Sequence, residues 1–446
     1  MIKNNIFTAE IIDYTSEGLG VCRYDGQAVF VRGAARGDIA KVRVVKVGAG
    51  ALPGKAGAQP PSPRYAWGKI DELVKPSEWR INDSCKAYPM CGGCDMRHIS
   101  YDEELVFKRN KVEQTLKRLG GIELSAMDVI AAEDIEGYRN KAIIPIGRRG
   151  DEVVMGYYRA RSHDIVPHMG CAVNTPEINL CADVTRKFLE RNDIDTARHL
   201  LVRATDGGVQ AGLIVKSGLK NSGQWVEMLR ENCREIKSIL MIENPREDNV
   251  LLSGVVKTLW GDLTLVERLG GLEFELHPFA FAQVNTNQAV KLYDLAHEYV
   301  GECRVVADLF CGTGTLTLWS ARGAERIFGV EIVPEAVECA RRNAERNGIA
   351  NAEFFLGDAG EIRLPEKAEV VIVDPPRSGL DLTAVGAVAA LEPERIVYVS
   401  CDPATLARDI KLFTERGYRA DRLGIVDMFP RTRHVECVVR LQRARD

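Results

Sequence analysis

Apolar and polar residues alternate along the first 47 residues, in short runs separated by glycines. The alternation is clearest at residues 20–24, 28–32 and 41–45, and it returns at residues 65–74. A period of two predicts short β-strands, and the glycines between them predict tight turns. We therefore expect a small β-barrel, interrupted at residues 48–64 by a loop rich in glycine, alanine and proline. Barrels of this size bind nucleic acid in some proteins and are only structural in others.

The middle of the chain mixes two periodicities. Residues 101–119 follow a helical pattern, whereas residues 141–146 and 210–215 are short apolar runs typical of strands. This mixture predicts an α+β domain.

The last third of the chain is more regular, because apolar strands alternate with helical segments. The strands are expected at residues 305–310, 326–332, 352–357, 370–374 and 395–400. Such alternation predicts a parallel, doubly wound sheet that binds its ligands at the carboxyl ends of the strands. We accordingly predict a multidomain α/β protein, with a barrel at residues 1–76, an α+β domain at 77–280 and a Rossmann-like domain at 281–446.

Composition narrows the class of protein. With 446 residues, 46% hydrophobic and 27% charged, the chain has the balance of a globular protein of several domains. It contains no apolar run of the roughly 18 residues that a membrane helix needs. The N-terminus lacks the apolar core of a secretory signal, so we expect a cytoplasmic protein whose twelve cysteines stay reduced. The net charge of −4 means that any contact with RNA must come from local basic patches.

A candidate cofactor site follows the first of these strands. Asp308 ends the strand, Gly312 and Gly314 allow the backbone to approach a ligand closely, and Glu331 ends the next strand. The spacing of the glycines is not that of a pyrophosphate loop, so it fits S-adenosylmethionine better than a dinucleotide. Glu331 suits the ribose hydroxyls, and Asp358, at the end of the third strand, suits the adenine. The alternative is a tight turn with a helix cap.

A candidate nucleophile lies at the end of the fifth strand. Cys401 is followed by Asp402, which suits a helix N-cap, and by Pro403, which suits the first helical position. Helix amides and the helix dipole favour a thiolate there. Asp374 ends the fourth strand before two prolines, and Glu436 opens an apolar strand as a candidate base. A buried structural cysteine and a solvated glutamate are the alternatives.

Four further cysteines are candidate metal ligands. Cys85, Cys91 and Cys94 are close in sequence, and Cys171 is distant. Four thiolates are the ligand count of a tetrahedral zinc or of a cubane iron–sulfur cluster, and the spacing alone does not choose between them.

Taken together, these segments closely resemble the RNA 5-methyluridine methyltransferase family, most of all the bacterial enzymes that act on large-subunit ribosomal RNA. The resemblance spans nearly the whole chain. It is carried by the four cysteines and by residues 16–20, 138–141, 281–285, 308–314, 374–376, 400–401 and 434–436. It implies an RNA-binding TRAM-type barrel, a central domain with a [4Fe-4S] cluster, and a class I domain that binds S-adenosylmethionine.

The resemblance also implies roles for single residues. Cys401 is the expected nucleophile and Glu436 the expected base, in methylation of uridine carbon 5. Two residues depart from the family's commoner pattern, since Asp402 and Thr315 stand where asparagine is frequent. The residues expected around the cofactor and the target base are Gln283, Phe310, Thr315, Glu331, Asp358 and Asp374.

The expected partner is RNA, with neither DNA nor a membrane, and we expect the chain to act as a monomer. A uridine in folded RNA must be swung out before a thiol can reach it, and Phe281 could stack on a base. The same chemistry on the T-loop uridine of transfer RNA is the nearest alternative. A non-catalytic RNA-binding protein and a small-molecule methyltransferase are more distant ones. Candidate phosphate contacts are Arg159, Arg161, Arg198, Arg203, Arg431 and Arg433.

Overall fold

The computed structural model describes residues 1–48, 65–126, 129–168, 170–248, 250–361 and 363–444. The loop expected at residues 48–64 therefore lies, except for its first residue, outside the described residues. The chain forms two compact units. Unit 1 comprises Met1–Lys111 and Phe429–Arg433, and unit 2 comprises Val112–Met428 and His434–Asp446. The three domain ranges expected from the sequence stay a prediction.

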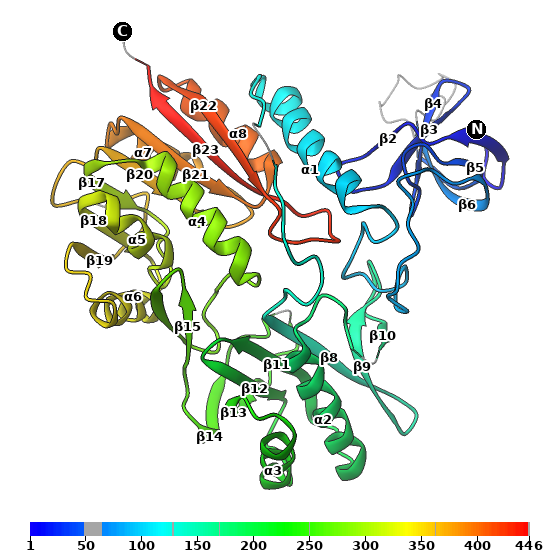
Figure 1. Ribbon diagram of the computed structural model, residues 1–446, viewed down its shortest axis with the longest axis horizontal. Helices are drawn as coiled ribbons and strands as arrows, with labels where there is room; N and C mark the ends of the chain where they lie inside the picture. The colour runs from blue at the N-terminus through cyan, green and yellow to red at the C-terminus, as the bar shows by residue number, and fades with distance from the viewer. Residues whose placement is uncertain (49–64, 127–128, 169, 249, 362, 445–446) are drawn as a thin grey trace, which may run out of the picture. The chain divides into compact units, whose positions relative to one another are not determined.

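Unit 1 contains a six-stranded sheet and the start of helix α1 (Tyr101–Thr115). The sheet has the order β1-β5-β6-β4-β3-β2 and is antiparallel except for the pair β4 and β6 (Figure 1). Alternate residues of the strands point into a core that includes Val29, Val31, Val42 and Val44, as the period of two predicts. The strands are β1 (Ile6–Glu10), β2 (Asp13–Tyr14), β3 (Gly20–Tyr24), β4 (Gln27–Val31), β5 (Ile39–Val47) and β6 (Tyr65–Lys75).

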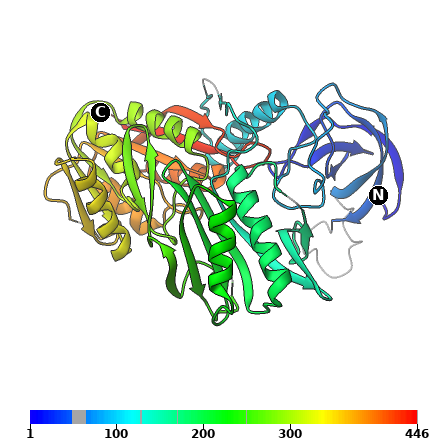
Figure 2. The same ribbon diagram turned by 60° about the horizontal axis from the view of Figure 1, so that its bottom comes forward.

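Unit 2 contains a seven-stranded sheet of order β10-β9-β8-β11-β12-β13-β14. Its pairs are antiparallel except β12 with β13. Helices α2 (Pro176–Asn192) and α3 (Ser222–Asn232) lie side by side against this sheet (Figure 2). The predicted α+β character of this region is confirmed. The strands are β8 (Lys141–Arg149), β9 (Glu152–Tyr158), β10 (Ile165–Pro167), β11 (Ala197–Thr205), β12 (Gly208–Val215), β13 (Ile236–Glu243) and β14 (Val255–Gly261).

The second large sheet of unit 2 has the order β19-β18-β17-β20-β21-β23-β22-β7. All five strands expected in the last third are present, and they are parallel to one another. The sheet is not parallel throughout, because β23 is antiparallel to both β21 and β22. The strands are β7 (Val129–Ile130), β17 (Cys303–Asp308), β18 (Ala324–Glu331), β19 (Ala352–Leu356), β20 (Val370–Val373), β21 (Arg395–Ser400), β22 (Tyr418–Val426) and β23 (Glu436–Arg443).

Helices cover both faces of this sheet. Residues such as Ala307, Val371 and Val373 pack with α7 and α8, while α4 packs on β21, β22 and β23. A hairpin, β15 (Leu265–Leu269) with β16 (Leu272–Leu276), completes the strands. The remaining helices are α4 (Thr286–Val300), α5 (Thr315–Ser320), α6 (Pro334–Arg346), α7 (Leu382–Ala390), α8 (Pro403–Thr414), a π-helical turn η1 (Leu116–Gly120) and a 3-10 turn η2 (Ala321–Gly323). Within the described residues, no helix is long and apolar enough to cross a membrane.

Candidate functional site

The loop between β17 and α5 has the shape that its glycines predict. Gly312 and Gly314 have φ values of +54° and +83°, a region that favours glycine. A Cβ at Gly314 would lie 3.0 Å from Ala340 and from Phe354, so this glycine allows α5 to pack closely. Nothing lies within 4 Å of the place where a Cβ at Gly312 would stand. The loop therefore leaves open space at Gly312, where a ligand can approach the backbone.

Asp308 and Glu331 flank this loop, and their carboxylates differ in their hydrogen bonds. Asp308 is buried, and its Oδ2 accepts a hydrogen bond of 2.6 Å from Thr317. Its Oδ1 accepts none within the described part of the chain, and burial raises the pKa of Asp308 to about 6. Glu331 accepts hydrogen bonds from the amides of Gly312 and Val333, at 3.1 and 2.9 Å. Glu331 thus fixes the shape of the loop through its hydrogen bonds, whereas Asp308 Oδ1 is still able to accept one.

The other expected cofactor residues differ in their surroundings. Asp358 is exposed, and its Oδ1 accepts the amide of Gly360 at 2.7 Å, which is the turn that the alternative interpretation described. Phe310 is half-buried against the core. Gln283 and Thr315 line one small cavity together with Glu267, Leu269, Phe274, Leu276, Ala282, Ala289 and Tyr293. The fold therefore brings Gln283 to the start of α5.

Two residues of the seven-stranded sheet, and the residue just before β8, hold the segment that carries Phe281 and Gln283. Lys141 Nζ and Arg203 Nη2 both donate to the Ala280 carbonyl, at 3.1 and 2.7 Å. Asn140 Nδ2 donates to the Gln283 carbonyl at 3.3 Å. Burial, together with the charge of Arg203, lowers the pKa of Lys141 to about 7.

Phe281, between these anchored carbonyls, is 75% exposed. An aromatic ring held out on a fixed backbone suits stacking on a base.

Asp374 lies directly after β20, at the carboxyl edge of the sheet. Burial and the charge of Asp308 raise its pKa to about 7. The loop that follows is fixed by α8, because Asp409 accepts the Leu380 amide at 2.8 Å and Arg408 donates to the Ser378 carbonyl at 2.9 Å. This anchoring was not evident from the sequence, because it depends on the packing of α8 against the loop.

Cys401 lies between β21 and α8, half-buried. The predicted cap is confirmed, since the Asp402 carboxylate accepts the amides of Ala404 and Thr405 at 2.8 and 3.2 Å. That cap uses helix amides that the sequence argument had assigned to a thiolate. Burial and the charge of Glu436 raise the pKa of the Cys401 thiol to about 11. Burial therefore works against the helix-stabilised thiolate that the sequence predicts, and the role of Cys401 stays a prediction.

Arg377 is the residue that the sequence argument missed. Its charge and its hydrogen bonding lower the pKa of Cys401, against the effect of burial and of the nearby carboxylates. It also lowers the pKa of Glu436, which burial and Asp374 hold well above the usual range. Its position three residues after Asp374 was the available signal. One guanidinium thus acts on both the expected nucleophile and the expected base.

Glu436 is the first residue of β23 and is 4% exposed. It pairs with Val426, the last residue of β22. The alternative of a solvated glutamate is therefore wrong. Asp374, Arg377, Cys401 and Glu436 influence one another electrostatically, so the expected nucleophile, the expected base and a cation lie at one edge of the sheet.

The four cysteines expected to bind a cluster fall in different units. Cys85, Cys91 and Cys94 are half-buried in unit 1, where the amide of Gly93 donates to Cys91 Sγ at 3.4 Å. Cys171 is half-buried in unit 2. Four thiols are a donor set that suits an iron–sulfur cluster. Among the residues that the structure describes, no three metal-ligating side chains are gathered to hold a metal.

Most of the expected phosphate contacts have structural roles. Arg203 and Arg431 are 3% and 7% exposed, so the prediction that they meet phosphate at the surface is wrong. Arg198 donates to the carbonyls of Asn244 and Arg246, and Arg433 pairs with Asp95 and Glu17. Arg159 and Arg161 are exposed.

Three family models match the chain. Residues 4–56 match the TRAM domain, residues 306–376 match a methyltransferase domain, and residues 360–444 match tRNA (uracil-5-)-methyltransferase. The last match includes the expected nucleophile and base.

Relatives extend the similarity to the full length. An uncharacterized RNA methyltransferase of Clostridium acetobutylicum is 35% identical over 99% of this chain and 98% of its own. Another from Caldanaerobacter subterraneus is 36% identical over 97% of each. The crystal structure of Pyrococcus abyssi tRNA (uracil-54, C5)-methyltransferase with S-adenosyl-L-homocysteine superposes with a TM-score of 0.76, at 28% identity, covering 97% of this chain and 99% of that one. On these grounds the chain belongs to the RNA 5-methyluridine methyltransferase family.

Proposed function

We propose that this protein methylates carbon 5 of a uridine in 23S ribosomal RNA, with Cys401 as nucleophile and Glu436 as base. The observation that carries the proposal is the joint placement of Cys401, Glu436, Asp374 and Arg377 at one edge of the sheet, beside the Gly312 loop. Carbon 5 of uracil is a poor nucleophile, and a reaction there needs both an attacking group and a base.

In the first step the Cys401 thiolate forms a bond to carbon 6 of uracil. The electron pair of the ring double bond moves toward carbon 5 and the carbonyl at carbon 4, which makes carbon 5 nucleophilic. Arg377 supports this step because it opposes the effect of burial on the Cys401 pKa. S-adenosylmethionine, when bound, supplies an electrophilic methyl group on a sulfonium.

In the last step Glu436 takes the proton from carbon 5. The electron pair of that bond restores the ring double bond, and the bond between sulfur and carbon 6 breaks to release Cys401. A carboxylate with a raised pKa is a strong base, so burial beside Asp374 suits Glu436 to this step.

The residues that would hold the cofactor follow from the loop geometry. Asp308 Oδ1 is a buried acceptor at the start of the loop that leaves open space at Gly312, and Asp374 is a half-buried carboxylate at the end of the neighbouring strand β20. Their raised pKa values indicate a site short of positive charge, which a ligand with an ammonium and a sulfonium would correct. We assign Gln283, Phe310, Thr315, Glu331 and Asp358 to the same site, in keeping with the family resemblance.

RNA binding by unit 1 is the second part of the proposal. Phe30, Tyr65 and Trp67 form a chain of ring contacts on the sheet, with centroids 5.9 and 5.2 Å apart, and Lys46 lies 5.1 Å from the Trp67 ring. These side chains are only half-buried or exposed. Aromatic rings beside a lysine suit unpaired bases and phosphates.

The third part is a [4Fe-4S] cluster on Cys85, Cys91, Cys94 and Cys171. Its support is the donor set and the amide that faces Cys91 Sγ. Metal analysis of protein purified without oxygen would find about four irons and four sulfides per chain for the cluster, or about one zinc for the alternative. No step of the reaction depends on this cluster.

Mapping of modified RNA tests the substrate and the nucleophile together. The RNA of a host that lacks the gene is analysed by mass spectrometry after return of either the wild type or Cys401→Ala. We expect methyluridine to disappear from 23S ribosomal RNA and to return only with the wild type. Loss in transfer RNA alone would favour the second candidate substrate, which the likeness to the Pyrococcus abyssi enzyme supports. No change in either RNA would overturn the proposal.

A further inference from the structure

The base Glu436 stands directly at the end of a hairpin loop. Strands β22 and β23 pair from Val426 with Glu436 onward, so residues 427–435 form the loop that closes the hairpin. The last pair of a ladder is the one most prone to open, because only one side of it is supported. The position of Glu436 therefore depends on how the loop is held.

The two ends of the loop belong to unit 2. Gln288 Nε2 donates to the Asp427 carbonyl at 3.0 Å, and Asn285 Nδ2 donates to the Met428 carbonyl at 3.2 Å. Both side chains come from the start of α4. At the other end, Val435 is buried in the core beneath the large sheet.

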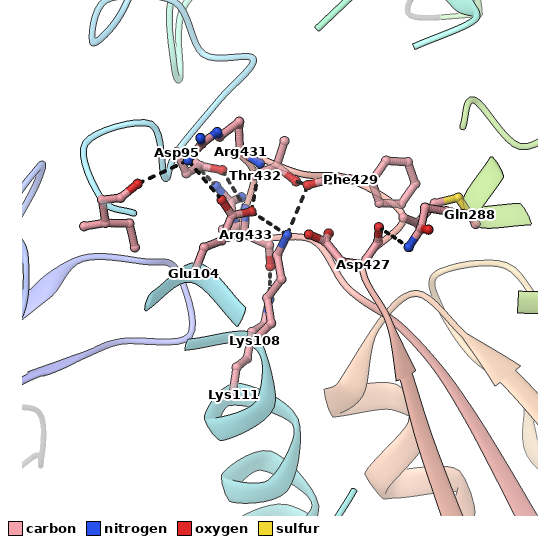
Figure 3. A network of polar contacts seen from close by, with 12 residues as sticks. Asp95, Glu104, Lys108, Lys111, Gln288, Asp427, Phe429, Arg431, Thr432 and Arg433 are labelled. Carbon is pink, nitrogen blue, oxygen red and sulfur yellow. Dashed lines mark hydrogen bonds and ion pairs between the residues drawn. The ribbon is translucent and has the colours of Figure 1, made fainter. Parts of the chain in front are cut away.

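The centre of the loop, Phe429–Arg433, belongs to unit 1 and is called the strap below. Its backbone is bound by side chains of α1 (Figure 3). Lys108 Nζ donates to the Phe429 carbonyl at 3.2 Å, Glu104 Oε1 accepts the Arg431 amide at 2.8 Å, and Lys111 Nζ donates to the Arg433 carbonyl at 2.9 Å. Three successive turns of α1 thus grip one short segment.

The α1 side chains that bind the strap include charged groups that are costly to bury. Glu104 and Lys108 form an ion pair of 2.7 Å in which neither side chain is exposed. Arg431 has a φ of +69°, a conformation that a non-glycine residue keeps only where its surroundings fix it. Its carbonyl accepts the amides of Asp95 and Met96, both at 3.1 Å. These contacts fix the conformation of the strap within unit 1.

We propose that the strap is a positioning device through which α1 of unit 1 holds Glu436 in place for removal of the carbon 5 proton. Lys108 and Lys111 are then positioning residues, which act through the strap and touch no reacting atom. The inference rests on the proposed function, because it concerns the last step of that reaction.

The proposal separates two steps that an ordinary loss of structure would slow together. Methyl transfer requires Cys401, which is outside the hairpin loop. Release requires Glu436 to take the proton, so that the bond between Cys401 and carbon 6 can break. A loosened strap therefore leaves methylated RNA joined to Cys401.

The test uses Lys111→Met in the full chain, with total RNA from a host lacking the gene and S-adenosylmethionine labelled in its methyl group. After ribonuclease digestion and denaturing electrophoresis, label that stays on the protein reports the covalent adduct. Label in RNA and protein together reports methyl transfer. Lys111→Arg retains the donor to Arg433, and Lys117→Met removes an exposed lysine of the adjoining turn as a matched control.

We expect Lys111→Met to raise the retained fraction of label about tenfold while the rate of methyl transfer stays within about twofold. Lys111→Arg and Lys117→Met should behave as the wild type. If the retained fraction of label is unchanged, the proposed role of the strap is wrong, whether or not methyl transfer and release both become slower.

A second variant keeps the test decisive if Lys111→Met does not fold. Arg433→Met removes the ion pairs of the strap with Asp95 and Glu17, and should raise the retained fraction in the same direction. Glu436→Gln serves as the reference for complete retention. If Glu436→Gln retains label and the strap variants do not, only the positioning role of the strap is refuted. If the wild type transfers no methyl group to RNA, the proposed function is refuted as well.

Discussion

Buried charges occur in two regions of this protein, but only one of these regions balances them. In unit 1, the carboxylate of Glu104 pairs with Lys108 within α1, and the carboxylate of Asp38 is bound by Arg80. At the carboxyl edge of the large sheet in unit 2, burial raises the pKa values of Asp308 and Asp374. Buried charges that are paired belong to the structural framework, whereas buried carboxylates with strongly raised pKa values are typical of functional sites.

The most damaging change to the unbalanced region should be one that removes its proposed base, Glu436. Glu436→Gln keeps the shape and hydrogen-bonding capacity of the side chain but cannot take a proton. We expect turnover to fall at least about a thousandfold, with labelled methyl groups retained on the protein. Steady-state turnover and the electrophoretic assay above would measure both effects. Glu415→Gln, at an exposed position, is the matched control; turnover by Glu436→Gln within tenfold of wild type would refute the role of the base.

The balanced region should respond through stability. Lys108→Met leaves the Glu104 carboxylate buried without its nearest cation, a change that costs about 3–5 kcal/mol in other proteins. Denaturant titration followed by circular dichroism would measure the loss. Lys117→Met breaks an exposed pair with Glu123 and should change the free energy of unfolding far less. Equal effects of the two substitutions would contradict the contrast between the two regions.

The sequence predicted the sheet of unit 2 well because its signal is local. Buried parallel strands appear as short apolar runs, and β17, β18, β19, β20 and β21 each fall within a residue or two of the expected bounds. The cap at Asp402 was predicted for the same reason, since its partners follow it directly in the chain. The antiparallel direction of β23 was not part of that pattern.

The site was predicted less completely, because its electrostatics depend on residues distant in sequence. Lys108 binds the carbonyl of Phe429, far along the chain, and nothing local to either residue indicates that contact. The pKa of Cys401 is likewise raised by burial and by Glu436, which is distant in sequence. The sequence had indicated only the helix that follows the cysteine, which would lower that pKa. Arg377 was visible in the sequence, but its action on two reacting groups required the fold.

Arg377 offers a way to sharpen the contrast, because it is a cation acting on the unbalanced region. It lowers the pKa of Cys401, so Arg377→Met should raise that pKa further above 11 and reduce the thiolate at every lower pH. We expect the rate of methyl transfer at neutral pH to fall about tenfold or more. The rising limb of the pH–rate profile should move to higher pH.

The control for this prediction is Arg377→Lys, which keeps the charge and should recover part of the rate. A lower rate with an unshifted pH profile would mean that Arg377 only shapes the loop after Asp374.

A last effect, a gain in stability, should come from relieving the imbalance itself. Asp374 has a folded pKa of about 7, above its ordinary value of 3.8, so its protonated form stabilises the fold. That contribution is complete below about pH 4 and is lost as the pH rises through about 7. Asp374→Asn cannot ionise and should therefore be more stable than the wild type at pH 8, by up to about 4 kcal/mol.

The pH dependence separates this explanation from a change in packing. The two proteins should have similar free energies of unfolding near pH 4, and their difference should grow between pH 4 and pH 7, as measured by denaturant titration across that range. A constant difference would contradict a raised pKa at Asp374. Because Asp374 belongs to the proposed site, a gain in stability accompanied by a loss of activity would mean that this edge of the sheet keeps its uncompensated charge at the expense of the fold.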